Sequence, residues 1–286
     1  MKKMAIISPS SFTSEYDEKN VCYFLSMQGY EPVYGEHAFE YDRFLAGSDD
    51  MRANDIMWAF QNKAIDAIMT LRGGYGSARL LDKLDYRLIS KNKKPFFGFS
   101  DTTALQLALW KKSKLISFSG IQASFLQNHL NTGLRNSFGI SLFQNRMHWT
   151  NLTPVTQGTT TGILLGGTLS LITSLMGTPY EPDFKKAILV LEDVGEEPYK
   201  VDRMLTQLRL AGVFKKISGV VLGDWHNCVS KNPYDGDIEA VLNEHFAHLP
   251  IPVVKDFPYG HGIKDTVFPI GAKACLNATE GILKIL

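Results

Sequence analysis

Short apolar runs alternate with amphipathic stretches along the first 120 residues of the chain. The apolar runs are typical of buried strands and lie at residues 4–8, 64–71, 95–99 and 115–118. Between them, apolar residues recur at helical spacing in the stretches 15–27, 49–61, 77–84 and 101–111. This alternation predicts an α/β fold with a parallel sheet flanked by helices. Binding sites in such folds lie beyond the carboxyl ends of the strands.

The periodicity weakens between about residues 128 and 161, where Asn, Thr, Ser and Gln are frequent and a helix near 134–143 is the one element expected. Strands are then expected at 162–165, 187–191 and 219–222, and helices at 169–176, 201–211 and 238–246. Gly166-Gly167 is expected to form a turn, and the rest of the chain to form short strands and turns. We therefore predict one domain over residues 1–130 and another over 155–286, joined by a connecting region at 131–154.

Composition narrows the classes of function. The 286 residues are 44% hydrophobic and 21% charged, with a formal net charge of +1, so no basic surface favours nucleic acid. The apolar run 4–7 is too short for a signal peptide and Pro9 ends it, and no segment has the length of a membrane span. Three widely spaced cysteines suggest neither disulfides nor a metal site. We expect a cytoplasmic protein without a metal, a cofactor, a nucleic-acid partner or a membrane partner.

The tetrapeptide Gly98-Phe99-Ser100-Asp101 ends one apolar run and opens an amphipathic stretch. A strand that turns sharply into a helix at a serine can present the hydroxyl as a nucleophile, with helix N-terminal amides beside it. The second glycine of the Gly-x-Ser-x-Gly pattern is missing, because Thr102 stands in its place. A serine before a helix is also a common N-cap, so the local sequence leaves both interpretations open.

A nucleophilic serine needs a base and a group that orients the base. His261 stands between two glycines, which permit close approach of another group, and its imidazole is suited to general-base chemistry. It could equally be an exposed loop histidine, since six other histidines compete. Glu192 follows the apolar run 187–191 and could orient a histidine from the end of a strand. It could instead face water, and three neighbouring carboxylates compete for the role: Asp193, Glu196 and Glu197.

A glycine-rich loop, Arg72-Gly73-Gly74-Tyr75-Gly76-Ser77, joins a predicted strand to a predicted helix. One interpretation is a phosphate cradle, although Arg79 replaces the third glycine and no Gly-Lys-Ser/Thr sequence follows. The loop could instead direct its amides at the nucleophile as an oxyanion hole, or it could be a tight structural turn.

Taken in order along the chain, these motifs resemble the LD-carboxypeptidases, the muramoyltetrapeptide carboxypeptidases of serine peptidase family S66. The motifs that carry the resemblance extend over nearly the whole sequence: residues 72–81, 84–86, 98–105, 166–169, 191–196, 202–208 and 260–262. The resemblance implies a Rossmann-like N-terminal domain and a smaller, β-rich α+β C-terminal domain. It also implies a triad of Ser100, Glu192 and His261 at the domain interface, with oxyanion donors among the backbone amides of Gly73, Gly74 and Asp101.

The implied reaction is hydrolysis of the L,D-amide bond that releases terminal D-Ala from a peptidoglycan tetrapeptide or muropeptide during cell-wall recycling. Substrate contacts are expected from Arg72, Tyr75 and Arg203, and either arginine could bind the terminal carboxylate bidentately. The family resemblance also implies a homodimer.

Two positions depart from the usual family pattern. The family often has Gly-Gly-Asn where this chain has Thr168 after the two glycines, and Gly-Pro where this chain has Gly120-Ile121. We expect neither position to touch the triad, although both could alter substrate contacts. Two alternatives remain: a microcin-immunity-type peptidase that cleaves aminoacyl-nucleotide antibiotics, and a non-catalytic nucleotide- or sugar-binding module.

Overall fold

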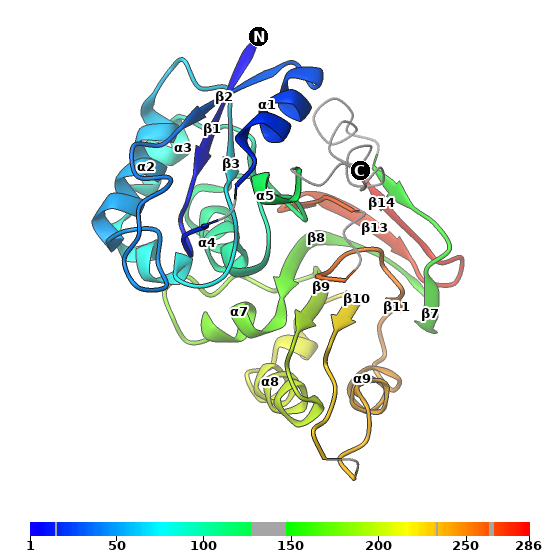
Figure 1. The fold of residues 1–286 in the computed structure, drawn as a ribbon. Helices are drawn as coiled ribbons and strands as arrows, with labels where there is room; N and C mark the ends of the chain where they lie inside the picture. Colours follow the sequence, from blue (N-terminus) through cyan, green and yellow to red (C-terminus); the bar gives the residue numbers. More distant parts are fainter. Residues whose placement is uncertain (15, 127–146, 233, 263–265) are drawn as a thin grey trace.

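A computed structural model describes residues 1–14, 16–126, 147–232, 234–262 and 266–286. Within these residues the strands form two sheets, and helices pack against both (Figure 1). The expected α/β class is confirmed. The helix expected near 134–143 lies outside the described residues.

The first sheet has the strand order β12-β5-β4-β3-β1-β2. Its members are β1 (Lys2–Ile7), β2 (Tyr30–Tyr34), β3 (Ala67–Thr70), β4 (Phe96–Gly98), β5 (Ser117–Ser119) and β12 (Phe268–Ile270). Strands β1 to β5 run parallel, and their carboxyl ends share one edge. The parallel sheet is as predicted, although β2 was not among the predicted strands. Strand β12 comes from the second half of the chain and pairs antiparallel with β5.

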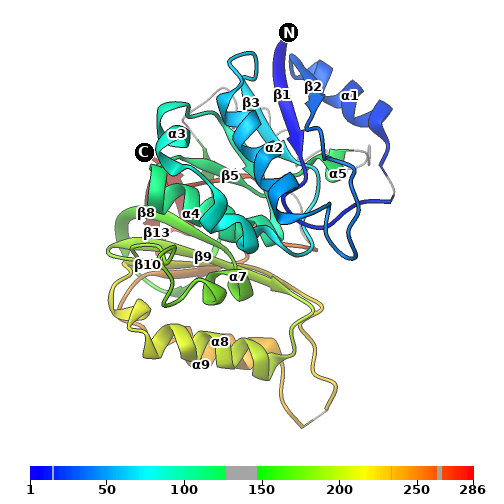
Figure 2. The ribbon, with the colours of Figure 1, turned by 90° about the vertical axis from the view of Figure 1, so that its left-hand side faces the viewer.

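Helices cover both faces of this sheet (Figures 1 and 2). They are α1 (Glu18–Met27), α2 (Asp49–Gln61), α3 (Tyr86–Lys91), α4 (Thr103–Ser113) and α5 (Ala123–Leu126). Alternate residues of β1 point to opposite faces, so Met4 and Ile6 pack with α1 and α5. Ala5 and Ile7 lie in the larger cluster, with the apolar residues of α2 and α4.

The second sheet has the order β6-β14-β13-β8-β9-β10-β11-β7. Its members are β6 (His148–Trp149), β7 (Thr153–Thr156), β8 (Thr159–Thr168), β9 (Ala187–Val194), β10 (Gly219–His226), β11 (Val253–Lys255), β13 (Lys273–Asn277) and β14 (Ile282–Ile285). The four central strands are parallel, and the outer strands are antiparallel. Three helices pack against this sheet: α7 (Leu169–Ser174), α8 (Pro198–Leu210) and α9 (Ile238–Phe246). Figure 2 shows α8 and α9 on the side away from the first sheet.

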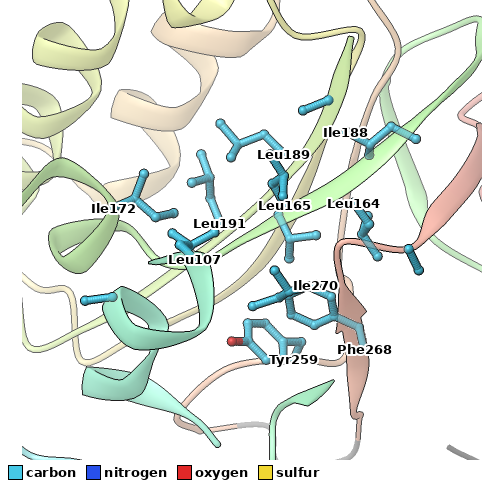
Figure 3. Packing of buried hydrophobic residues seen from close by; sticks show 14 of the residues in the cluster. Leu107, Leu164, Leu165, Ile172, Ile188, Leu189, Leu191, Tyr259, Phe268 and Ile270 are labelled. Atoms are coloured by element: carbon cyan, nitrogen blue, oxygen red, sulfur yellow. The ribbon is translucent and has the colours of Figure 1, made fainter. Parts of the chain in front are cut away.

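One hydrophobic cluster joins the two sheets. Leu107 of α4 lies beside Leu191 of β9 and Ile172 of α7, although these residues come from different halves of the chain (Figure 3). Tyr259 and Phe268 belong to the same cluster and are fully or almost fully buried. The two halves therefore share a core, and their relative placement is fixed by packing.

Two sequence expectations differ from the structure. The turn expected at Gly166-Gly167 is wrong, because both residues continue β8, with φ values of 140° and 134°. A Cβ on Gly167 would lie 2.5 Å from the Thr103 hydroxyl oxygen, so the strand needs glycine where α4 begins. The helix expected at 77–84 is present, but it has 3-10 geometry over Ser77–Lys83.

Within the described residues, no helix combines the length and the apolarity needed to cross a membrane.

Asp193 fixes the start of α7 from the end of β9. Its carboxylate accepts hydrogen bonds from the backbone N–H groups of Ser170 and Val194, both at 2.8 Å. Burial, together with the neighbouring Glu192, nevertheless raises the pKa of Asp193 to about 6. The folded protein therefore retains a proton at Asp193 at pH values where the unfolded chain has released it.

This proton predicts a pH-dependent contribution to stability. Between an unfolded pKa near 3.8 and a folded pKa of about 6, the native state binds more protons, so the contribution of Asp193 is lost as pH rises. From about pH 4.5 to about pH 7.5, the unfolding free energy of the wild type should fall by roughly 2 kcal/mol relative to Asp193→Asn. Urea denaturation at both pH values measures this difference. The exposed Asp82→Asn is the matched control, and parallel pH profiles for wild type and Asp193→Asn would contradict the prediction.

Candidate active site

Ser100 occupies a strained turn between β4 and α4. Its φ is 62°, a left-handed conformation that is costly for a residue with a Cβ. Ser100 is the N-cap of neither following helix, because Phe99 holds that position for the 3-10 turn Ser100–Thr102 and Thr102 holds it for α4. The serine side chain points instead at His261, whose Nε2 lies 2.9 Å from the Ser100 Oγ. The capping interpretation of this serine is therefore not seen in the structure.

His261 is held between Ser100 and Glu192. Its Nδ1 lies 2.7 Å from Glu192 Oε2, and its ring packs against Phe99 with the centroids 4.7 Å apart. The imidazole is largely buried, with 18% of its side-chain surface exposed. One ring nitrogen therefore faces the serine and the other faces a carboxylate, the arrangement in which an imidazole can accept a hydroxyl proton.

Two contacts hold the histidine loop. Asp224 accepts a hydrogen bond from the backbone N–H of Gly262 at 2.7 Å. The buried Tyr259 hydroxyl lies 2.8 Å from the Ser119 Oγ, which links the loop to β5 of the first sheet. Burial is the main cause that raises the pKa of Tyr259 well above its ordinary value. The phenol is therefore neutral and can donate a hydrogen bond.

Glu192 is the carboxylate that contacts His261, and it is completely buried at the end of β9. Its other oxygen, Oε1, accepts a hydrogen bond of 2.6 Å from the Thr168 hydroxyl. Two of the three competing carboxylates have other contacts: Asp193 binds the start of α7, and Glu197 lies 3.5 Å from Lys200. The expectation that Thr168 does not touch this constellation is wrong, because β8 and β9 pair in parallel with Thr168 opposite Glu192.

Asp101 organises the glycine-rich loop through its side chain, a role that the sequence analysis missed. The buried carboxylate accepts hydrogen bonds from Ser10 Oγ at 2.6 Å, Ser77 N at 2.8 Å and Gly76 N at 3.2 Å. These two amides bind a carboxylate of the protein itself, which disfavours the phosphate cradle. An Asp directly after the serine was visible in the sequence, but its partners lie 24 to 91 residues away.

The start of the same loop faces the serine. A Cβ on Gly73 would lie 3.0 Å from Ser100 Cβ and 3.3 Å from its Oγ, so the Gly73 backbone closely approaches the hydroxyl. Gly74 has a φ of 108° and packs against Ser11 instead. Among the described residues, the backbone N–H groups of Gly73 and Gly74 have no hydrogen-bond partner. They are thus available to an acceptor beside Ser100.

A cavity of about 550 Å³ opens in front of Ser100 and His261. Arg72 lines it together with Gly73 and Gly74, and the Arg72 Nη1 donates a hydrogen bond of 3.0 Å to the backbone oxygen of Phe12. Two other expected substrate contacts are not among the described lining residues. Tyr75 is half exposed and packs edge-on against Phe44, and Arg203 is exposed on α8 over the ring of Tyr199.

The described residues contain no group of three or more His, Cys, Asp or Glu side chains arranged to bind a metal ion. All three cysteines carry free thiols.

Comparison with known proteins points to one family. The chain matches the family models of the LD-carboxypeptidase N-terminal domain over residues 4–120 and the C-terminal domain over residues 161–276. A probable murein peptide carboxypeptidase of Bacillus subtilis is 32% identical over 97% of this chain and 89% of that protein.

Two solved structures superpose over almost the whole chain. The muramoyltetrapeptide carboxypeptidase from Oxalobacter formigenes is 32% identical with a TM-score of 0.89, covering 99% of this chain and 97% of that one. The MccF-like protein from Bacillus anthracis is 28% identical with a TM-score of 0.89, covering 100% and 96%. The fold, the site geometry and these matches together lead to one conclusion: the chain belongs to the LD-carboxypeptidase family.

Proposed function

We propose that this protein is a serine LD-carboxypeptidase that releases terminal D-Ala from peptidoglycan tetrapeptides by hydrolysing the L,D-amide bond during cell-wall recycling. The observation that carries the proposal is the hydrogen-bonded series Ser100–His261–Glu192 at the wall of a cavity. The name of the Oxalobacter formigenes structure supports the choice of substrate.

In the first half of the reaction, His261 Nε2 takes the Ser100 proton while the Oγ forms a bond to the scissile carbonyl carbon. Glu192 stabilises the imidazolium that results. The tetrahedral intermediate collapses when the C–N bond breaks, and the departing D-Ala nitrogen receives the proton from Nε2. This leaves an acyl ester on Ser100.

In the second half, His261 takes a proton from a water molecule, and the hydroxide attacks the ester carbonyl. The ester C–O bond breaks, and Ser100 regains its proton from Nε2. Every proton in this scheme moves through one imidazole nitrogen, and no metal ion takes part.

We assign the oxyanion hole to the backbone amides of Gly73 and Asp101, with Gly74 beside them. Gly73 is the stronger candidate of the two glycines, since its backbone approaches Ser100 while Gly74 packs against Ser11. Each such donor is worth about 3 kcal/mol in comparable sites.

We assign the terminal carboxylate of the substrate to Arg72. A carboxypeptidase must hold a free carboxylate, and a guanidinium can bind one bidentately. Arg72 lines the cavity and uses Nη1 on Phe12, whereas Arg203 is exposed on α8 outside the described lining.

A second candidate is the cleavage of aminoacyl-nucleotides, which the similarity to the MccF-like protein favours. This activity would call for an aromatic platform for a nucleobase from the second half of the chain. Among the described lining residues, the second half contributes Val194 and His261, and the aromatic side chains, Phe99 and Phe125, come from the first half. The carboxypeptidase therefore remains the better-supported function.

We also propose that the protein is a cytoplasmic homodimer. Three free thiols suit a reducing compartment, and the family resemblance supports the dimer.

Replacing Ser100 by Ala should abolish D-Ala release. Loss of the nucleophile should lower kcat by at least about 10⁴-fold, as in other serine hydrolases. Mass analysis of an L,D-linked tetrapeptide, a D,D-linked control peptide and an aminoacyl-nucleotide measures turnover and selectivity together. The exposed Ser174→Ala should behave as wild type, and a chelator should leave the activity intact.

Three results would overturn parts of this proposal. Full activity of Ser100→Ala would exclude the serine mechanism. Turnover of the aminoacyl-nucleotide in preference to the tetrapeptide would favour the second candidate. Loss of activity with a chelator, restored by a divalent cation, would contradict the metal-free scheme.

Replacing Arg72 by Ala should remove the preference for a free terminal carboxylate. A charged hydrogen-bonded pair contributes about 1.5–3 kcal/mol, so KM for the tetrapeptide should rise roughly 10–100-fold. The same peptide with a C-terminal D-Ala amide should be hydrolysed equally well by both enzymes. If Arg203→Ala rather than Arg72→Ala abolishes the distinction between acid and amide, the assignment to Arg72 is wrong.

Light scattering on the purified protein measures the oligomeric state. A mass of twice 32.0 kDa is expected at micromolar concentration, and a mass of 32.0 kDa would contradict the homodimer.

A further inference from the structure

The carboxylate of Glu192 has two hydrogen-bond partners, and the triad accounts for one of them. Oε2 faces His261 Nδ1 at 2.7 Å, and Oε1 accepts from the Thr168 hydroxyl at 2.6 Å. Glu192 has no exposed surface and Thr168 is 2% exposed. The Thr168 hydroxyl is the donor in this contact, and the carboxylate oxygen is the acceptor.

The position of Thr168 follows from strand register. Strands β8 and β9 pair in parallel, and Thr168 stands opposite Glu192 at the carboxyl end of both. Paired residues of neighbouring strands project from the same face of a sheet. The hydroxyl thus binds the carboxylate oxygen that does not contact the histidine, and the two bonds together fix the rotation of the carboxyl group.

Thr168 is itself tied to the helix that follows the nucleophile. Its backbone N–H donates to the Thr103 Oγ1 at 3.3 Å, and Thr103 is the first residue of α4, three positions after Ser100. Gly167 lets β8 come this close, because a Cβ there would lie 2.5 Å from the same oxygen. Hydrogen bonds connect Ser100 to His261, Glu192, Thr168 and Thr103 in turn. The backbone from Thr103 to Ser100 closes this ring.

We propose that Thr168 is a positioning residue for the hydrolysis. Its hydroxyl orients the Glu192 carboxylate toward His261 in a fully buried site. The inference rests on the proposed function, since it assumes that His261 is the base and Glu192 its partner. Thr168 does not line the cavity, so its effect reaches the substrate through the triad.

Thr168→Val tests this role, because valine keeps the shape and removes the hydroxyl. Because this variant loses a hydrogen bond to a carboxylate, its kcat should be about 10–100-fold lower than that of the wild type. Its KM for the tetrapeptide should stay within about twofold of the wild-type value. Thr168→Ser keeps the hydroxyl and should retain a kcat within about threefold of wild type. Thr173→Val is the matched control, because it removes a buried hydroxyl that binds backbone oxygens of α7 rather than Glu192.

Thermal denaturation accompanies the kinetics. If Thr168→Val does not fold, Thr168→Ala replaces it, with the same expected kcat. A wild-type kcat in the hydroxyl-free variant, a loss confined to KM, or a Thr168→Ser enzyme as slow as Thr168→Val would each overturn the inference. Ser100→Ala distinguishes a failure of this inference from a failure of the proposed function. If Ser100→Ala is inactive while Thr168→Val is fully active, the role of Thr168 is wrong and the proposed function stands. If Ser100→Ala is active, the proposed function itself fails.

Discussion

The site depends on a carboxylate that has no contact with solvent. Burying a polar group is costly unless hydrogen bonds replace those lost to water, and Glu192 meets this condition at both oxygens. Its partners come from β8 and from the loop that carries His261, so the carboxylate is compensated only when both are in place. The long strand β8 and its parallel register with β9 are therefore needed for the geometry of this site as well as for the sheet.

A second buried carboxylate arranges the other side of the cavity. Asp101 receives two amides of the glycine-rich loop and a hydroxyl from the loop after β1. The residue that follows the strained Ser100 thus binds the loop whose first glycine faces the serine. Strain at Ser100 is maintained because its neighbours on both sides are fixed, which is the usual condition for such backbone conformations at functional sites.

The features that could be predicted from the sequence are those that depend on local periodicity and composition. The parallel sheet, the limits of α2 and α9, and the strand preceding Ser100 follow from local patterns. Strand β2 was missed because Pro32 and half-buried side chains hide its alternation at a sheet edge. The Gly166-Gly167 strand and the Thr168–Glu192 contact could not be predicted, since they depend on packing against α4 and on pairing between strands distant in sequence. Local patterns do not contain such information.

A functional site built from two halves of a chain must hold its side chains to within about 0.5 Å of the working geometry. The chain contacts the first sheet on both sides of His261. Tyr259, two residues before the histidine, is hydrogen-bonded to Ser119 of β5, and β12, which follows the histidine, pairs with β5. Both contacts reach the strand adjacent to β4, which leads directly into Ser100. His261 and Ser100 are therefore positioned from neighbouring strands of one sheet. Displacing the second sheet would have to break this pairing and open the shared core before it could separate His261 from Ser100.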